Sequence, residues 1–342
     1  MKIQLSALIL GLTLGVPAAH AADTLSTQIA AAQRSGKASW LAWTVPSTAD
    51  GVVCCWNGRQ SRDTQSCSLS STNYGMNMGS SSDGMPQIDD TLMVYAHVDA
   101  AGVDKIRVFS NSCRVDRGTE SVQDVANVTP AESVRYLDTL IPGGGDSDGD
   151  RATKRRSDGA LMAIALHDDA SADPVIERIA SAGDTKSLRH SAAFWLGNTR
   201  GRPGYEALVR LRASADASLR DQLTFAFTQS KVPEAQATLI DMARNDPSSK
   251  VRGQALFWIA QKAQNKSDAE VVRGAVDNDP DVDVKKKAVF ALSQIPNGEG
   301  VTELIRVARE NKTPEVRKQA MFWLGQSKDP RALAFFEKIL AQ

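Results

Sequence analysis

The sequence predicts a mostly α-helical protein, a right-handed α-solenoid of about six helix pairs preceded by a small disulfide-bonded α+β domain. Three observations support this: a repeat every 31 to 33 residues in the C-terminal half, four cysteines confined to the region before it, and a Gly- and Asp-rich stretch between the two. Self-similarity at such a period is typical of solenoids. We expect a signal peptide (1–21), an α+β domain (22–141), a linker (142–155) and a solenoid (156–342).

The repeat is clearest in two copies, 251–261 and 316–326, and the copies begin at 156, 188, 219, 251, 284 and 316. Within one copy, Val251, Ala255 and Ile259 recur at helical spacing, which predicts an amphipathic first helix. A second amphipathic run follows each first helix. Several of these runs open with Pro, which the first helical position tolerates.

Three further columns recur in the repeats. A basic residue follows each start, and we expect it to reach an Asp in a neighbouring repeat's turn; these are Arg189, Arg220, Arg252, Lys285 and Arg317. An amide stands ten positions after each start, where it would hold the backbone at the helix C-terminus; these are Asn198, Gln229, Gln261, Gln294 and Gln326.

The third column alternates large and small residues: Trp195, Trp258 and Trp323 with Ala163, Ala226 and Ala291. We interpret it as core packing of each large ring over a small neighbour, with a ligand-stacking row as the alternative.

Helix pairs of this length, with Asp-Pro turns and a Val-Arg-x-x-Ala start, resemble HEAT repeats. They are most similar to the short bacterial kind also seen in phycobilisome lyases, and the whole chain resembles an exported bacterial HEAT-repeat domain-containing protein. The resemblance covers residues 156–342 and implies the solenoid architecture. It implies no activity, because the fold hosts many functions. Some HEAT enzymes bind iron through repeated His-Glu pairs, and this chain has none.

The N-terminus has the pattern of a secretory signal. Lys2 supplies the charge, residues 5–16 are apolar, and Ala19-His20-Ala21 provides a small-x-small cleavage site. We expect cleavage after Ala21 and a periplasmic or secreted protein; an uncleaved anchor is the alternative. No later stretch could span a membrane. Lys+Arg and Asp+Glu balance at 40 each, which gives no electrostatic case for nucleic acid.

The four cysteines, Cys54, Cys55, Cys67 and Cys113, predict two disulfides in an exported protein. Adjacent residues on a strand point to opposite faces, so Cys54 and Cys55 would bond to different partners among Cys67 and Cys113. Which bonds to which stays open. The absence of Cys-x-x-Cys and of a completing His argues against redox chemistry or zinc.

The α+β domain is expected to contain two helices and several strands. Alternating apolar residues predict strands over 39–45, 51–56, 66–69, 91–98 and 105–109. Helices are expected over 24–33 and 130–141, the second with Thr129 as N-cap and Glu132 completing a capping box.

Two segments suggest metals. The expected loop 70–89 carries Met76, Met78 and Met85, soft ligands suited to copper, although an adaptable loop that packs methionines explains them as well. The acidic run 146–150 in the linker resembles a calcium loop but lacks its Gly and bidentate Glu, which favours a flexible spacer.

No catalytic motif is present, so we expect no enzyme and no cofactor. The fold instead predicts an interaction scaffold that binds another protein on a concave face formed by the second helices. The expected contacts are Glu177, Arg178, Glu206, Arg210, Asp241, Arg244, Arg273, Glu303, Arg306 and Arg309. Apolar residues on several faces of the last helix suggest a homo-oligomer or docking end: Leu333, Phe335, Phe336, Ile339 and Leu340. A copper carrier built on the Met loop and an unrecognised enzyme in the N-terminal domain remain alternatives.

Overall fold

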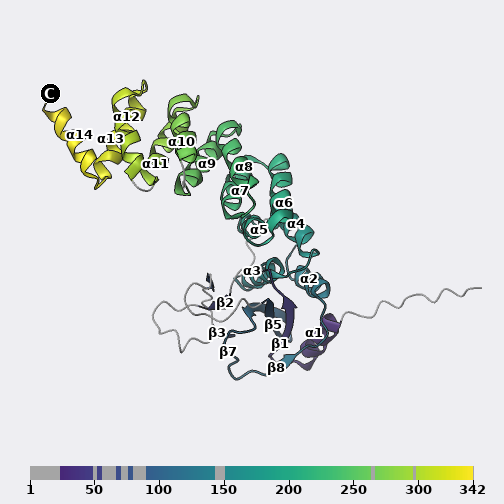
Figure 1. The fold of residues 1–342 in the computed structure, drawn as a ribbon. Coiled ribbons are helices and arrows are strands. Elements are labelled where there is room, and N and C mark those ends of the chain that lie inside the picture. The colour runs from purple at the N-terminus through teal and green to yellow at the C-terminus, as the bar shows by residue number, and fades with distance from the viewer. Residues whose placement is uncertain are drawn as a thin grey trace, which may run out of the picture.

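The structure is a computed structural model, shown in Figure 1. It describes residues 24–48, 52–55, 67–70, 76–79, 90–142, 151–262, 266–295 and 298–341. The expected signal peptide, Met85 and the acidic run 146–150 lie outside the described residues.

The repeats form the helix pairs that the sequence predicts. The first helices of the pairs are α3 (Arg151–Leu166), α5 (Lys186–Thr199), α7 (Ala217–Gln229), α9 (Ser249–Gln261), α11 (Val282–Gln294) and α13 (Pro314–Gln326). The second helices are α4 (Ala172–Ala182), α6 (Gly201–Ser214), α8 (Glu234–Asn245), α10 (Lys266–Asn278), α12 (Glu299–Glu310) and α14 (Pro330–Leu340). The six described pairs stack in chain order into a solenoid (Figure 1), as expected. None of the described helices has the length and apolar character needed to cross a membrane.

The first helices are held by a buried apolar stripe and by acidic or hydroxyl caps. On α9, Val251, Ala255 and Ile259 are fully buried, which confirms the periodicity seen in the sequence. At the N-terminus of α7, the Asp216 carboxylate accepts a hydrogen bond from the Leu219 N–H at 2.8 Å. The Asp281 carboxylate does the same for α11. Each cap satisfies an amide that has no partner within its helix.

The N-terminal domain is built on a four-stranded sheet in the order β6-β5-β1-β8. Its strands are β1 (Ser39–Pro46), β5 (Thr91–Asp99), β6 (Gly102–Ser110) and β8 (Val122–Asp124). β1 pairs antiparallel with β5 and parallel with β8, and β5–β6 is a hairpin. Gly102 opens β6 at φ 119°, a conformation that L side chains rarely adopt.

The rest of the domain flanks this sheet. Helices α1 (Thr24–Ser35) and α2 (Pro130–Thr139) contribute to its main core, and two short ladders pair β2 (Val52–Cys55) with β4 (Met76–Gly79) and β3 (Cys67–Ser68) with β7 (Val115–Asp116). The structure corrects one expectation here. Met76–Gly79 is a strand rather than loop, and Met-Asn-Met is a two-residue alternation too short to stand out in a Ser- and Gly-rich segment.

The two faces of the sheet contribute to different cores, because successive strand residues point to opposite sides. Leu41, Trp43 and Val45 belong to the core that continues into the helices. Trp40 and Ala42 belong to a smaller cluster with Cys67, Tyr95 and Phe109.

Helix α3 belongs to the solenoid and to the N-terminal domain at once. It packs along β6 so closely that a Cβ on Gly159 would lie 2.7 Å from the Ile106 carbonyl oxygen. The end of β1 also contacts the turn after α3, where the Thr48 N–H donates to the Leu166 carbonyl at 2.9 Å. Residues 151–155 of the expected linker lie in α3, and the sheet and the first repeat share one continuous core.

The helices of the array form two layers. Successive first helices pack more closely along the array than successive second helices do. At Gly197 on α5, an added Cβ would lie only 2.1 Å from the Ala226 carbonyl oxygen of α7. Close packing on one side and wider spacing on the other bend the array toward the closely packed side. In Figure 1, α5, α7 and α11 lie inside the bend, and α6, α8 and α12 lie outside.

Candidate functional site

The second helices, where partner contacts were expected, lie in the widely spaced outer layer. Many of their charged side chains bind one another. Arg210 of α6 donates to both carboxylate oxygens of Glu177 on α4, at 2.9 and 2.7 Å. Arg306 of α12 binds Glu303 at 2.9 Å and Asp277 of α10 at 3.1 Å. The Arg210–Glu177 and Arg306–Asp277 pairs join successive second helices.

The remaining expected contacts are engaged in similar ways. Arg273 binds Glu303 at 3.1 Å, Arg178 binds Asp138 of α2, and Asp241 accepts from Arg212. The Arg309 guanidinium lies over the Phe335 ring, 5.2 Å from its centroid. Glu206 and Arg244 have no ion pair in the described part of the chain. The expected contact residues therefore act mainly in joining repeats, and the array presents a different surface on its inner side.

A row of aromatic rings follows the first helices across five repeats, from α5 to α13. Phe194 of α5 and Phe225 of α7 lie nearly parallel, 13° apart, with centroids separated by 5.9 Å. Phe225 then contacts Trp258 of α9 at 4.7 Å. The pattern repeats one step along: Phe257 and Phe290 lie 7° from parallel with centroids 5.8 Å apart, and Phe290 contacts Trp323 at 4.8 Å. In α5, α9 and α13, which carry both residues, the Phe and the Trp meet edge to face, as in Phe257–Trp258.

This aromatic row is packed yet partly accessible. Trp195, Trp258 and Trp323 pack against the hydrophobic core, which confirms the core interpretation. Trp258 packs between Phe225 of the preceding first helix and Phe257 of its own helix. The four phenylalanines from Phe194 to Phe290 are half-buried, and Phe322 at the end is 54% exposed.

Amide side chains border the aromatic row on the same helix faces. On α9, Gln254, Phe257 and Gln261 follow at i, i+3 and i+7, so they share one face. The Gln261 amide donates to the Gln294 amide oxygen of α11 at 3.4 Å. Gln229 and Gln294 donate to the hydroxyls of Thr228 and Ser293. The expectation that these amides hold the helix backbone is therefore wrong for these three.

We call this surface the inner stripe. It comprises the phenylalanines Phe194, Phe225, Phe257, Phe290 and Phe322, with the amides Asn198, Gln229, Gln261, Gln294, Gln326, Gln222, Gln254 and Gln319. It also includes Lys287, which stands at the position of Gln254 and is the one charged residue in these columns. The sequence patterns identified the tryptophan column and the later amide column, but not the phenylalanine column, the column of Gln254 or the layer that presents them.

The basic column behaves as predicted at two of its five positions, where an arginine binds an Asp in a turn between repeats. Arg252 binds the Asp279 carboxylate through two hydrogen bonds, and Arg220 binds Asp246 in the same way. Arg189, Arg317 and Lys285 each donate to a backbone carbonyl at the turn before their helix. Hydrogen bonding to Asp279 raises the pKa of Arg252, so it stays charged. This column holds repeats together and lies apart from the inner stripe.

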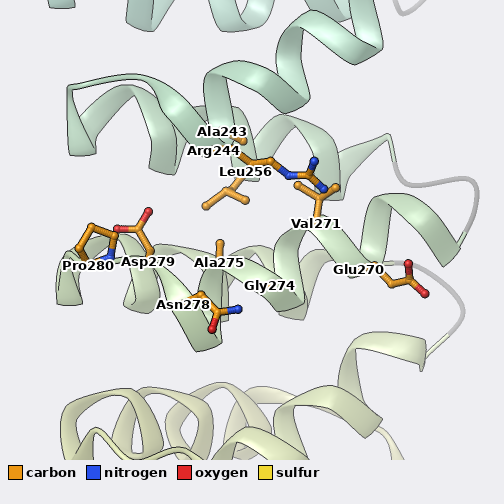
Figure 2. Close-up of a pocket in the computed structure, with 10 residues that line it drawn as sticks. All are labelled: Ala243, Arg244, Leu256, Glu270, Val271, Gly274, Ala275, Asn278, Asp279 and Pro280. Atoms are coloured by element: carbon orange, nitrogen blue, oxygen red, sulfur yellow. The ribbon is translucent and has the colours of Figure 1, made fainter.

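A cavity of about 290 Å³ opens between α8, α9 and α10, where the second helices separate. Figure 2 shows Arg244 extending from α8 toward Val271, while Glu270 on α10 points away. A second cavity, of about 230 Å³, is lined by Arg189 and His190. Partial burial and the neighbouring Arg189 lower the pKa of His190.

The N-terminal domain contains one described disulfide, between Cys54 and Cys113. This bond identifies the partner of Cys54, which the sequence left open. Cys67 is buried in the smaller core, and the Cys55 side chain lies outside the described residues, so the second bridge stays a prediction. The side chains of Met76 and Met78 also lie outside. Among the described residues, no group of three His, Cys, Asp or Glu side chains is arranged to hold a metal.

Comparison with known families agrees with the repeat architecture. Residues 269–342 match the family model for HEAT repeats. The C-terminal helix pairs are therefore similar to HEAT repeats. Among solved structures, human deoxyhypusine hydroxylase in complex with glycerol is similar, with 16% identity over 61% of this chain and 90% of that chain and a TM-score of 0.31. Kap121p is similar with 12% identity over 56% of this chain and 25% of that chain, at a TM-score of 0.36. No curated protein matches.

Proposed function

We propose that this HEAT-repeat protein is an interaction scaffold of the bacterial envelope that binds a protein partner on the inner stripe and catalyses no reaction. The proposal rests on the inner stripe. It is a continuous surface of partly exposed rings and amides that crosses several repeats on the closely packed side. In the outer layer, most of the expected contact residues are already in ion pairs.

The envelope location rests on the signal-like N-terminus and on the Cys54–Cys113 bond, since disulfides persist in oxidising compartments. Sequencing the N-terminus of the protein recovered from cells tests this part. We expect it to begin at Ala22, and an intact Met1 would contradict export.

The binding surface is tested by affinity capture from envelope extract with the full mature chain, because α3 shares its core with the sheet. One variant changes the inner stripe at its accessible end, Phe322→Ala with Gln326→Ala. The matched variant removes an outer ion pair, Glu177→Ala with Arg210→Ala. We expect the inner variant to lose the captured partner and the outer variant to keep it. The reverse result would assign recognition to the second helices and overturn the proposed surface.

A further inference from the structure

The inner stripe has a composition that selects one kind of ligand. Its amides each carry a hydrogen-bond donor and an acceptor, the same pair that a peptide group carries. A folded partner has already paired most of its backbone groups, whereas an extended segment leaves them free. Rings beside the amides provide apolar contact for the side chains of such a segment.

The charges on this face have mixed signs, which narrows the choice of ligand further: exposed Lys250, Asp283 and Glu315 stand one helical turn before the first amide column of the stripe. Lys287 is the one charged residue in the stripe columns from α5 to α13. Acidic or basic ligands would find no complementary row, since recognition of charge requires clustered opposite charge. A glycan would need separate flat ring faces. Here each central ring contacts other rings, as Phe225 does with Phe194 and Trp258.

The spacing of the repeats also suits a polypeptide. Packed helices lie roughly 8–10 Å apart. A polyproline-II-like strand rises ~3.1 Å per residue with three residues per turn, so equivalent groups recur about every 9 Å. One turn of such a segment would therefore advance by one repeat. The stripe spans the five first helices from α5 to α13, which corresponds to a segment of roughly 12–15 residues.

We propose that the inner stripe binds an extended, uncharged polypeptide segment, held through its main chain by the amide row and through its apolar side chains by the aromatic row. This inference rests on the proposed scaffold function and names the form of the partner. Gln261 and Gln294 lie at its centre, since their amides already meet across two repeats.

The test uses the full mature chain and, as probe, fluorescently labelled α-lactalbumin that has been reduced and carbamidomethylated so that it cannot fold. Fluorescence anisotropy gives its affinity. We expect Gln261→Ala with Gln294→Ala to weaken binding by about tenfold or more, because two neutral hydrogen-bonding groups are lost. The matched control, Asn245→Ala with Asn278→Ala, removes two amides from second helices and should change affinity less than about twofold. Circular dichroism melting confirms that both variants stay folded.

Two further measurements test whether binding depends on charge and whether it requires an unfolded ligand. Raising NaCl from low to high concentration should leave the affinity for the unfolded probe nearly unchanged, because salt screens only charge-driven binding. Natively folded α-lactalbumin should not bind. A steep loss of affinity with salt, equal losses in both amide variants, or no binding of the unfolded probe would overturn the inference.

The two experiments distinguish a missing peptide-binding site from a missing scaffold function. If the unfolded probe does not bind but the captured envelope partner still depends on Phe322 and Gln326, the scaffold stands and its partner binds in folded form. If neither the unfolded probe nor the envelope partner binds through the inner stripe, both proposals are wrong.

Discussion

Arg252 and Asp279 form a buried, two-pronged ion pair across adjacent turns of the array, with Nε–Oδ2 at 2.8 Å and Nη2–Oδ1 at 3.0 Å. The third guanidinium nitrogen donates to the Asp246 carbonyl at 2.9 Å. The Asp246 carboxylate in turn accepts from Arg220 of the preceding repeat. Asp246 therefore joins the α7–α8 pair to the α9–α10 pair.

We expect Asp246→Ala to destabilise the array strongly. Its carboxylate is 2% exposed, and its removal leaves the Arg220 charge with little compensation, a change that costs roughly 3–5 kcal/mol for buried pairs. Urea unfolding followed by circular dichroism measures the loss. Glu234→Ala is the control, because the Arg202–Glu234 pair is about half exposed on both sides. This control should lose much less stability, because exposed ion pairs contribute little, and equal losses in the two variants would contradict the special place of Asp246.

A second prediction concerns Gly197 in the inner layer. Replacing a helical Gly by Ala ordinarily stabilises by up to about 1 kcal/mol. Gly197→Ala should instead destabilise, because the new Cβ would meet the α7 backbone at 2.1 Å. Gly325 stands at the same place in the last pair, and a Cβ added there would have nothing within 4 Å, so Gly325→Ala should be neutral or stabilising. Melting temperatures of the two variants should move in opposite directions.

The close approach at Gly197 also explains what the sequence could and could not predict. Period and apolar spacing identify helix pairs, because both are local properties of the chain. Which layer bends inward depends on how closely successive helices approach, and this requires knowing which residues meet. The expectation that second helices form the inner face therefore differs from the packing observed, and the expected contact residues lie in the outer layer.

In the N-terminal domain, Glu132 likewise makes a contact that local sequence does not predict. Thr129 caps α2 as predicted, accepting from the Glu132 N–H at 3.2 Å. The Glu132 carboxylate was expected to return to the Thr129 N–H, but it accepts from the Leu25 N–H of α1 at 2.6 Å. A local motif was thus correctly recognised while its acidic member serves a distant helix, which the spacing of residues along the chain does not reveal.

The aromatic row should contribute stability at its centre and little at its end. Trp258→Ala removes a ring packed between Phe225 and Phe257 and should cost roughly 3–5 kcal/mol. Phe322→Ala, at a ring that is 54% exposed, should cost much less. Unchanged thermal unfolding of the Trp258 variant would contradict the core role of this column.

Trp258 allows a sharper comparison, because its buried indole N–H has no hydrogen-bond partner in the described structure. A buried donor without a partner carries a desolvation cost of about 1–3 kcal/mol. Trp258→Phe loses part of the ring but also removes this cost, so it should destabilise far less than Trp258→Ala. Equal losses would mean that the indole N–H is satisfied in solution.

The last prediction concerns pH and the junction between the sheet and the solenoid. His167 follows α3 and is fully buried; its Nδ1 lies 2.6 Å from the Ala163 carbonyl oxygen and its Nε2 lies 2.8 Å from the Ser133 hydroxyl. Nδ1 must donate to the carbonyl, so neutral Nε2 accepts from Ser133. Burial lowers the pKa of His167 to about 4 from its ordinary 6.5.

Because the unfolded chain binds this proton more readily than the folded one, the stability from neutral His167 is present above about pH 6.5 and is lost as pH falls toward 4. The loss amounts to roughly 3 kcal/mol for a pKa difference of this size. His167→Gln removes the titrating group, so its free energy of unfolding should fall less steeply between pH 6.5 and 4 than that of the unaltered protein. Urea unfolding at a series of pH values measures both slopes, and parallel curves would show that His167 is not buried as a neutral group.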